Sequence, residues 1–205
     1  MKLLVDIGNT RSKWATLSHG KLSEVTAVAN ADLIKALGEL KLNISEIGVA
    51  CVAEDKFVLA LSDYAKAKNI GFKRMTTEAK NFDVVNAYQE FKKLGIDRWL
   101  NLIAAHLTFP DKNKLIVSLG TATTLDILPS SGMHKGGWII PGIDMLQSSL
   151  LNNTANIISK MGIPEGTKPG KSTYENISQG SLLATEGAIL AALTNCELGN
   201  QQIDL

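Results

Sequence analysis

The sequence has few of the residues that mark a metal-rich or disulfide-stapled protein. Its 205 residues include two cysteines and three histidines. Cys51 and Cys196 each stand alone, without a second cysteine or a histidine at metal-site spacing. Because both kinds of site need such clusters, the sequence predicts neither a zinc site nor a disulfide framework.

An excess of one charge and long apolar runs are also missing. The formal net charge is +1 and the two signs are interspersed, so neither nucleic acid nor a membrane is expected as a partner. Asp6 interrupts the first hydrophobic stretch, and we expect no signal peptide and no transmembrane span. A composition of 45% hydrophobic residues favours an ordinary globular protein. Without a signal peptide or a membrane span, the cytoplasm is its expected location.

The first stretch of the chain carries a motif. Four apolar residues around the carboxylate of Asp6 predict a buried strand. Gly8-Asn9 predicts a tight turn into a second strand. Unpaired N–H groups at its tip, from Gly8 to Thr10, would suit a phosphate. Since a carboxylate repels phosphate unless a divalent cation lies between them, this pairing indicates Mg²⁺-nucleotide. An ordinary hairpin is the alternative.

The motif occurs twice. Residues 4–10 align with residues 116–122, and each copy runs from an apolar strand into a turn with glycine and threonine. Repetition of this unit predicts a duplicated domain with a phosphate loop in each half. We expect the α/β class, with two mixed-sheet halves around a nucleotide cleft, over residues 1–110 and 111–205.

Hydrophobic periodicity predicts the other elements. We expect strands at 12–17, 21–28, 47–52, 71–75, 114–119, 123–128 and 135–142, and helices at 31–40, 55–68, 99–109, 143–151, 173–179 and 182–196. Residues 76–94 are expected to form an irregular connection. Asp97 and Arg98 precede a helix, where a helix cap with a surface arginine is the alternative to a functional role. Glycines around strand 135–142 indicate either that the backbone comes close to a ligand or that the strand turns tightly into the next helix.

Four motifs together resemble the type III pantothenate kinases. They are residues 6–10 with Lys13-Trp14, residues 95–99, residues 120–124 with Asp126, and Gly136-Gly137 through Pro141-Gly142. The resemblance runs from Met1 to about Ala192. It implies a duplicated actin-like ATPase (ribonuclease H-like) fold, phosphorylation of pantothenate by ATP as the first step of coenzyme A synthesis, and a homodimer.

The resemblance also implies roles for individual residues. Asp6 would organise Mg²⁺, Lys13 would neutralise charge on the transferring phosphoryl group, and Asp97 would be the general base. Arg98 would bind the substrate carboxylate. The nucleotide-binding positions are Asp6, Ile7, Gly8, Asn9, Thr10, Arg11, Ser12, Lys13, Gly120 and Thr121. The pantothenate-binding positions are Tyr88, Gly95, Ile96, Asp97, Arg98 and Thr173.

Two features depart from the family pattern. The second loop usually starts with an Asp that binds a monovalent cation, K⁺ or NH₄⁺, and this sequence has Ser118 there. A neutral hydroxyl is a weaker ligand for a hard cation, so this ion is doubtful. The family also continues beyond the position of Leu205 with a further strand, turn and helix.

These departures leave other hypotheses open. One is a non-catalytic relative, either a degenerate paralogue or a transcriptional accessory factor. Another is a related kinase that acts on a sugar or an acid. The retained Asp6, Lys13, Asp97, Arg98 and Thr121 favour the pantothenate kinase.

Overall fold

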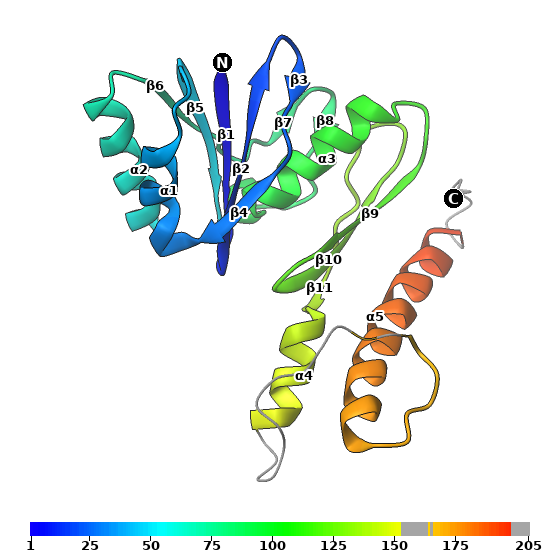
Figure 1. Cartoon of the computed structure of the whole chain (residues 1–205). Helices are drawn as coiled ribbons and strands as arrows, with labels where there is room; N and C mark the ends of the chain where they lie inside the picture. Colours follow the sequence, from blue (N-terminus) through cyan, green and yellow to red (C-terminus); the bar gives the residue numbers. More distant parts are fainter. Residues whose placement is uncertain (153–163, 165, 198–205) are drawn as a thin grey trace. The chain divides into compact units, whose positions relative to one another are not determined.

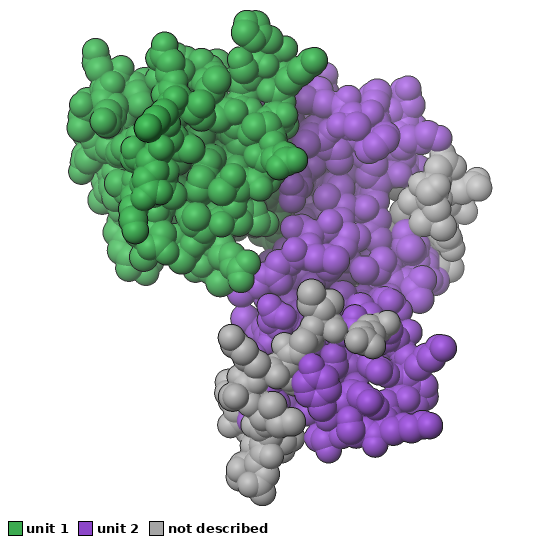
Figure 2. Space-filling view, in the orientation of Figure 1, with its two compact units in different colours: residues 1–79, 88–100 green, residues 80–87, 101–205 purple. Residues whose placement is uncertain are grey.

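The computed structural model describes residues 1–152, 164 and 166–197, which fall into two compact units (Figures 1 and 2). Unit 1 comprises Met1–Ala79 with Tyr88–Leu100, and unit 2 comprises Lys80–Ala87 with Asn101–Leu205. The end of the chain at residues 198–205 lies outside the described residues. Within the described ranges, no helix is both long and apolar enough to cross a membrane.

Unit 1 contains a mixed sheet. Its strands are β1 (Lys2–Ile7), β2 (Arg11–Ser18), β3 (Lys21–Leu22), β4 (Thr26–Ala29), β5 (Glu46–Cys51) and β6 (Gly71–Arg74). The order is β3-β2-β1-β5-β6, and β4 also pairs with β2. β1 runs antiparallel to β2 and parallel to β5. This sheet confirms the predicted α/β class.

The alternation of side chains along β1 sets the two faces of this sheet. Leu3, Val5 and Ile7 are buried, whereas Leu4 and Asp6 are exposed. The buried face packs in one hydrophobic cluster with α1 (Leu33–Glu39) and α2 (Asp55–Ala67), which lie side by side in Figure 1. A 3-10 turn, η1 (Asn30–Asp32), precedes α1. Asp6 therefore lies on the face of the sheet that points away from the core.

The single strand predicted over 21–28 is divided into β3 and β4. Ser23 lies between them, and its hydroxyl accepts the Thr16 N–H at 2.9 Å and donates to the Glu24 carbonyl at 2.9 Å. A serine side chain that binds nearby backbone groups competes with strand pairing. This local competition explains the break.

The connection 76–94 holds more structure than its sequence predicts. β7 (Lys80–Asn81) and β8 (Val84–Val85) form a two-stranded hairpin in unit 2, and η2 (Phe91–Lys93) follows in unit 1. α3 (Ile96–Thr108) then begins three residues earlier than expected.

Unit 2 is built on an antiparallel sheet with strand order β11-β10-β9. These strands are β9 (Lys114–Leu119), β10 (Ala122–Leu128) and β11 (Gly137–Pro141). Among the residues that the structure describes, this sheet has only antiparallel pairs, whereas the sheet of unit 1 is mixed. α4 (Ile143–Asn152) and α5 (Thr173–Glu197) lie side by side in Figure 1 and contact each other.

α5 is one continuous helix, and the prediction of two helices separated near Gly180 is wrong. A glycine inside a helix costs about 1 kcal/mol relative to alanine, which tertiary packing can offset. A β-carbon on Gly180 would meet no atom within 4 Å, so no steric feature breaks the helix there. The helix begins at a serine cap, because the Ser172 hydroxyl accepts the Glu175 N–H at 3.2 Å.

Candidate active site

The first hairpin presents two opposite charges on the exposed face of unit 1. Asp6 in β1 stands directly opposite Lys13 in β2, and cross-strand pairs of this kind lie on the same side of a sheet. Burial among neighbouring atoms raises the pKa of the Asp6 carboxyl, Lys13 lowers it, and the charge of Asp97 raises it again. The pKa effect places Asp97 within electrostatic reach of Asp6.

An apolar pocket of about 480 Å³ surrounds these charges on the sheet of unit 1. Asp6 and Lys13 are its two charged residues. The lining consists of Leu4, Val5, Asp6, Lys13, Trp14, Ala15, Leu22, Val25, Gly48, Ala50, Met75 and Leu100. An apolar wall removes water from a carboxylate, which accounts for the raised pKa of Asp6.

The turn after β1 is closed by a backbone bond. The Gly8 N–H donates to the Arg11 carbonyl at 3.1 Å, so the expectation that this N–H is unpaired is wrong. Neither Gly8 nor Asn9 adopts a positive φ. The turn therefore closes with ordinary backbone angles.

Asn30 supports this turn, although no sequence pattern predicts a role for it there. Its side-chain amide donates to the carbonyls of Gly8 at 2.9 Å and Asn9 at 3.4 Å, and its Oδ1 accepts the Ser12 hydroxyl at 2.8 Å. Because Asn30 follows the turn by more than twenty positions, no local pattern connects them. The side chain fixes the loop from the adjoining β4–η1 corner.

Two predicted nucleotide-binding residues are buried. The side chains of Ile7 and Ser12 have no exposed surface. Ile7 packs in the core, and the Ser12 hydroxyl is engaged with Asn30. Their contribution is to support the turn, whereas Asn9, Thr10, Arg11 and Lys13 are exposed.

Asp97 lies in the first turn of α3. Its Oδ1 accepts the backbone N–H of Arg98 at 2.8 Å, which uses one of the donors that a helix start leaves unpaired. A β-carbon on Gly95 would come within 2.5 Å of the same oxygen. A side chain at residue 95 would therefore displace the Asp97 carboxylate from this position.

Arg98 is buried, with 4% of its surface exposed. Its Nη1 donates to the Tyr88 hydroxyl at 2.9 Å, and its guanidinium carbon lies 5.7 Å from the centre of the Tyr88 ring. Two contacts with one aromatic side chain hold the guanidinium in a fixed orientation. Unit 1 therefore contains Tyr88, Gly95, Asp97 and Arg98 together with the first hairpin.

The second predicted phosphate turn lies in unit 2, between β9 and β10. The Gly120 N–H donates to the Ala122 carbonyl at 3.1 Å, much as Gly8 does in the first turn. This turn is one residue shorter, because Leu119 pairs with Thr123 whereas Ile7 pairs with Ser12. Thr121 is exposed, and its carbonyl accepts the N–H of Gly142 at 3.0 Å.

Two of the glycines around β11, Gly137 and Gly142, closely approach other backbone, whereas a β-carbon on Gly136 would meet no atom within 4 Å. A β-carbon on Gly137 would lie 2.0 Å from the Leu125 carbonyl oxygen, and one on Gly142 would lie 2.1 Å from that of Gly120. At Gly137 and Gly142 the close backbone approach is therefore that of a strand-turn-helix corner.

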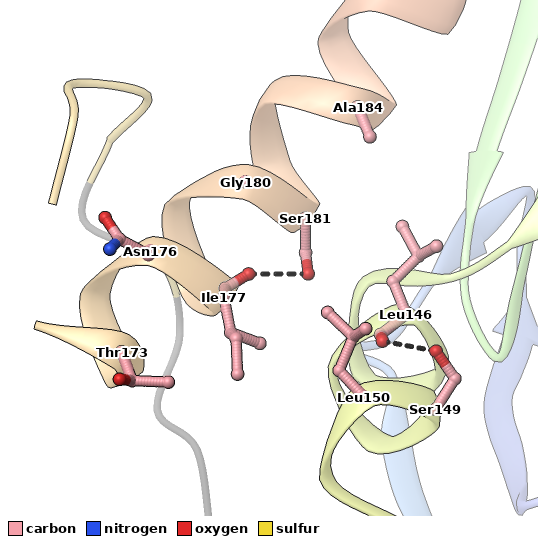
Figure 3. Close-up of a pocket in the computed structure, with 9 residues that line it drawn as sticks. All are labelled: Leu146, Ser149, Leu150, Thr173, Asn176, Ile177, Gly180, Ser181 and Ala184. Atoms are coloured by element: carbon pink, nitrogen blue, oxygen red, sulfur yellow. Dashed lines mark hydrogen bonds between the residues drawn. The ribbon is translucent and has the colours of Figure 1, made fainter. Parts of the chain in front are cut away.

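Thr173 lies at the start of α5, beside a pocket of about 440 Å³ between α4 and α5 (Figure 3). Leu146, Leu150 and Ile177 supply apolar side chains to this pocket. The Ser181 hydroxyl donates to the carbonyl of Ile177 at 2.8 Å, within its own helix. Thr173 therefore occupies the end of a mainly apolar space in unit 2.

Comparison with known proteins agrees with the motifs. A sequence model of type III pantothenate kinases matches residues 2–195. The type III pantothenate kinase of Colwellia psychrerythraea is 35% identical over 198 residues, which cover 96% of this chain and 80% of that protein. That of Pseudoalteromonas translucida is 36% identical over 204 residues, which cover 99% of this chain and 83% of that protein.

A solved structure shows the same fold. The crystal structure of a conserved protein from Campylobacter jejuni, assigned to the Baf family, superimposes with a TM-score of 0.58 at 22% identity. The match covers 93% of this chain and 78% of that chain. A likeness at this identity carries the fold alone, whereas the sequence matches carry the family. The chain belongs to the type III pantothenate kinase family.

Proposed function

We propose that this protein transfers the γ-phosphoryl group of ATP to the primary hydroxyl of pantothenate, which yields 4′-phosphopantothenate and ADP in the first step of coenzyme A synthesis. The observation that carries the proposal is the presence of Asp6, Lys13, Asp97 and Arg98 in one unit of a chain of this family. The reaction is assigned to the cytoplasm.

Each residue has a role that its surroundings support. The Asp97 carboxylate accepts the hydroxyl proton while the hydroxyl oxygen attacks phosphorus and the bond to ADP breaks. Lys13 neutralises charge on the transferring group. The substrate carboxylate pairs with Arg98, whose orientation Tyr88 fixes. Gly120 and Thr121 contact nucleotide phosphate, and Thr173 contacts pantothenate at a homodimer interface.

The cation requirements differ between the two loops. The Asp6 carboxylate lines the pocket of unit 1 and suits Mg²⁺, which binds through one or two carboxylates together with phosphates and water. Bound there, Mg²⁺ would offset the negative charge of the nucleotide phosphates. Ser118 is a neutral residue within β9, and its hydroxyl does not fit a hard monovalent cation as a carboxylate would. We assign no step to K⁺ or NH₄⁺.

The test is an assay of ADP release with ATP, Mg²⁺ and pantothenate, in potassium, in ammonium and in neither. We expect pantothenate-dependent turnover and a weak response to the monovalent salt. Asp97→Asn should lower kcat by about 10²–10⁴-fold. Because an asparagine Oδ1 can still accept the Arg98 N–H, the variant should unfold at the temperature of the wild type. An undiminished rate would place the base elsewhere.

A substrate panel tests the acceptor. Other hydroxy acids and sugars should be phosphorylated more slowly than pantothenate, because Arg98, whose orientation Tyr88 fixes, would pair with the pantothenate carboxylate. A different acceptor with a higher kcat/KM would overturn the assignment of pantothenate.

A further inference from the structure

The proposed reaction leaves unused a pair of buried ionisable side chains in unit 2. Asp126 on β10 and His134 in the β10–β11 connection have 2% and 4% of their surface exposed. The His134 Nε2 lies 2.9 Å from the Asp126 Oδ1. Burying a carboxylate is costly unless it is paired, so a pair of this kind requires a structural or functional reason.

The second nitrogen of the ring shows what the pair contacts. The backbone N–H of Ala87 donates to the His134 Nδ1 at 3.4 Å. An N–H donor requires an unprotonated acceptor, so Nδ1 carries no hydrogen. Nε2 then holds the hydrogen and donates it to Asp126, which fixes the tautomer and the orientation of the ring.

The backbone around His134 holds the same segment at a second point. The Val85 N–H donates to the Gly132 carbonyl at 2.9 Å, and the His134 N–H donates to the Val85 carbonyl at 3.1 Å. Val84, which directly precedes Val85, has no exposed surface. Residues 84–87 are therefore fastened to the β10–β11 connection of unit 2.

Ala87 is the last residue of this segment, and the chain enters unit 1 at Tyr88. The Tyr88 hydroxyl accepts the hydrogen bond from Arg98, the proposed partner of the substrate carboxylate. A peptide N–H held at Ala87 restricts the backbone from which the Tyr88 side chain projects. We propose that His134, oriented by Asp126, is a positioning residue that acts through Ala87 and Tyr88 on pantothenate binding. This inference rests on the proposed function.

Two variants of His134 separate its contacts. His134→Gln places a donor near the Nε2 position and lacks the acceptor for Ala87. His134→Asn places an acceptor near the Nδ1 position and lacks the donor to Asp126. The hydrogen bond from the Ala87 N–H to the His134 Nδ1 is the contact that acts on Tyr88. His134→Gln should therefore raise the KM for pantothenate by about fivefold, the effect of one lost neutral hydrogen bond. The KM for ATP should stay unchanged, and His134→Asn should have the smaller effect.

A double variant tests the route through Tyr88. In a Tyr88→Phe background, which lacks the hydroxyl that Arg98 contacts, His134→Gln should no longer change the KM for pantothenate. An equal increase in both backgrounds would overturn the proposal, as would a joint rise in the KM values for ATP and pantothenate, which a general structural role predicts.

Hydrogen exchange tests whether His134 holds the Ala87 amide, and this test needs no enzyme turnover. The Ala87 amide should exchange about fivefold faster in folded His134→Gln protein than in the wild type. An unchanged rate would overturn the anchoring, even in an active enzyme. Absence of pantothenate turnover in the wild type would instead overturn the proposed function, and the exchange rate would still decide whether His134 holds Ala87.

Discussion

At the residue scale, Asp6 combines a proposed catalytic role with a cost in stability. Burial is the main cause that raises the pKa of its carboxyl above 3.8, against the lowering effect of Lys13. A raised folded-state pKa means that the charged carboxylate is disfavoured in the fold. The stability that this group contributes is fully present below about pH 3.8 and is lost as the pH rises through the folded-state value.

We therefore expect Asp6→Asn to be inactive and yet more stable than the wild type at neutral pH. The difference in free energy of unfolding should shrink as the pH falls through the raised folded-state pKa, where the wild-type carboxyl takes up its proton. Urea unfolding of both proteins between about pH 8 and pH 4 measures this difference. Lower stability of the variant at pH 8 would show that attraction to Lys13 outweighs burial.

Gly95 offers a second test, one that moves Asp97 without replacing it. Gly95→Ala would bring a methyl group within 2.5 Å of the Asp97 Oδ1, so the carboxylate must shift. A displacement of about 1 Å can cost about a hundredfold in rate, and steady-state assays should show a large fall in kcat. As a control, Gly38→Ala in α1 has no atom within 4 Å of the new β-carbon and should keep full activity. Full activity of Gly95→Ala would remove Asp97 from the mechanism.

At the element scale, strands and helices with a repeated or periodic sequence pattern were predicted better than short elements held by contacts distant in the sequence. β1, β2, β5 and α2 follow the expected ranges closely because each has a clear apolar pattern. Asn30 was missed because its partners at Gly8 and Asn9 lie in another element. The β7–β8 hairpin was missed for a different reason, since its two-residue turn, Phe82-Asp83, lacks the Asn-Gly, Asp-Gly or Gly-Gly pair that signals such a turn.

That hairpin turn is conformationally unfavourable. Phe82 and Asp83 form the two-residue loop and adopt φ values of +46° and +61°, in the left-handed region that asparagine and glycine favour. Phe82 is also exposed. The double variant Phe82→Asn, Asp83→Gly should therefore stabilise the protein by about 1 kcal/mol, which raises Tm by about 2–4 °C.

The β2–β3 turn provides the matched control in calorimetry. Gly20 has a φ of +75° and no atom within 4 Å of an added β-carbon. Gly20→Ala should therefore lower stability by about 1 kcal/mol through backbone strain alone. A Tm for the hairpin double variant at or below that of the wild type would show that the Phe82 side chain contributes more than its backbone costs.

At the scale of the whole molecule, the chain passes between its two units three times, at residues 79–80, 87–88 and 100–101. A predicted half that spans residues 1–110 contains all of unit 1 together with the β7–β8 hairpin. The hydrogen-bond partners of that hairpin at Gly132 and His134 lie beyond residue 110. The repeated strands in the sequence predicted two halves. No periodic pattern indicated that residues 80–87 belong to unit 2.

A fragment of residues 1–110 tests how the segment 80–87 is stabilised. All strand pairs of the first sheet, and its core with α1 and α2, lie within residues 1–110, so amides of β1 and β5 should remain protected from hydrogen exchange in the fragment. The Val85 and Ala87 amides lose the acceptors in unit 2 and should exchange about fivefold faster or more than in the full chain. Equal protection in fragment and full chain would mean that unit 1 alone orders residues 80–87. In that case the anchor at His134 would be dispensable for holding Tyr88.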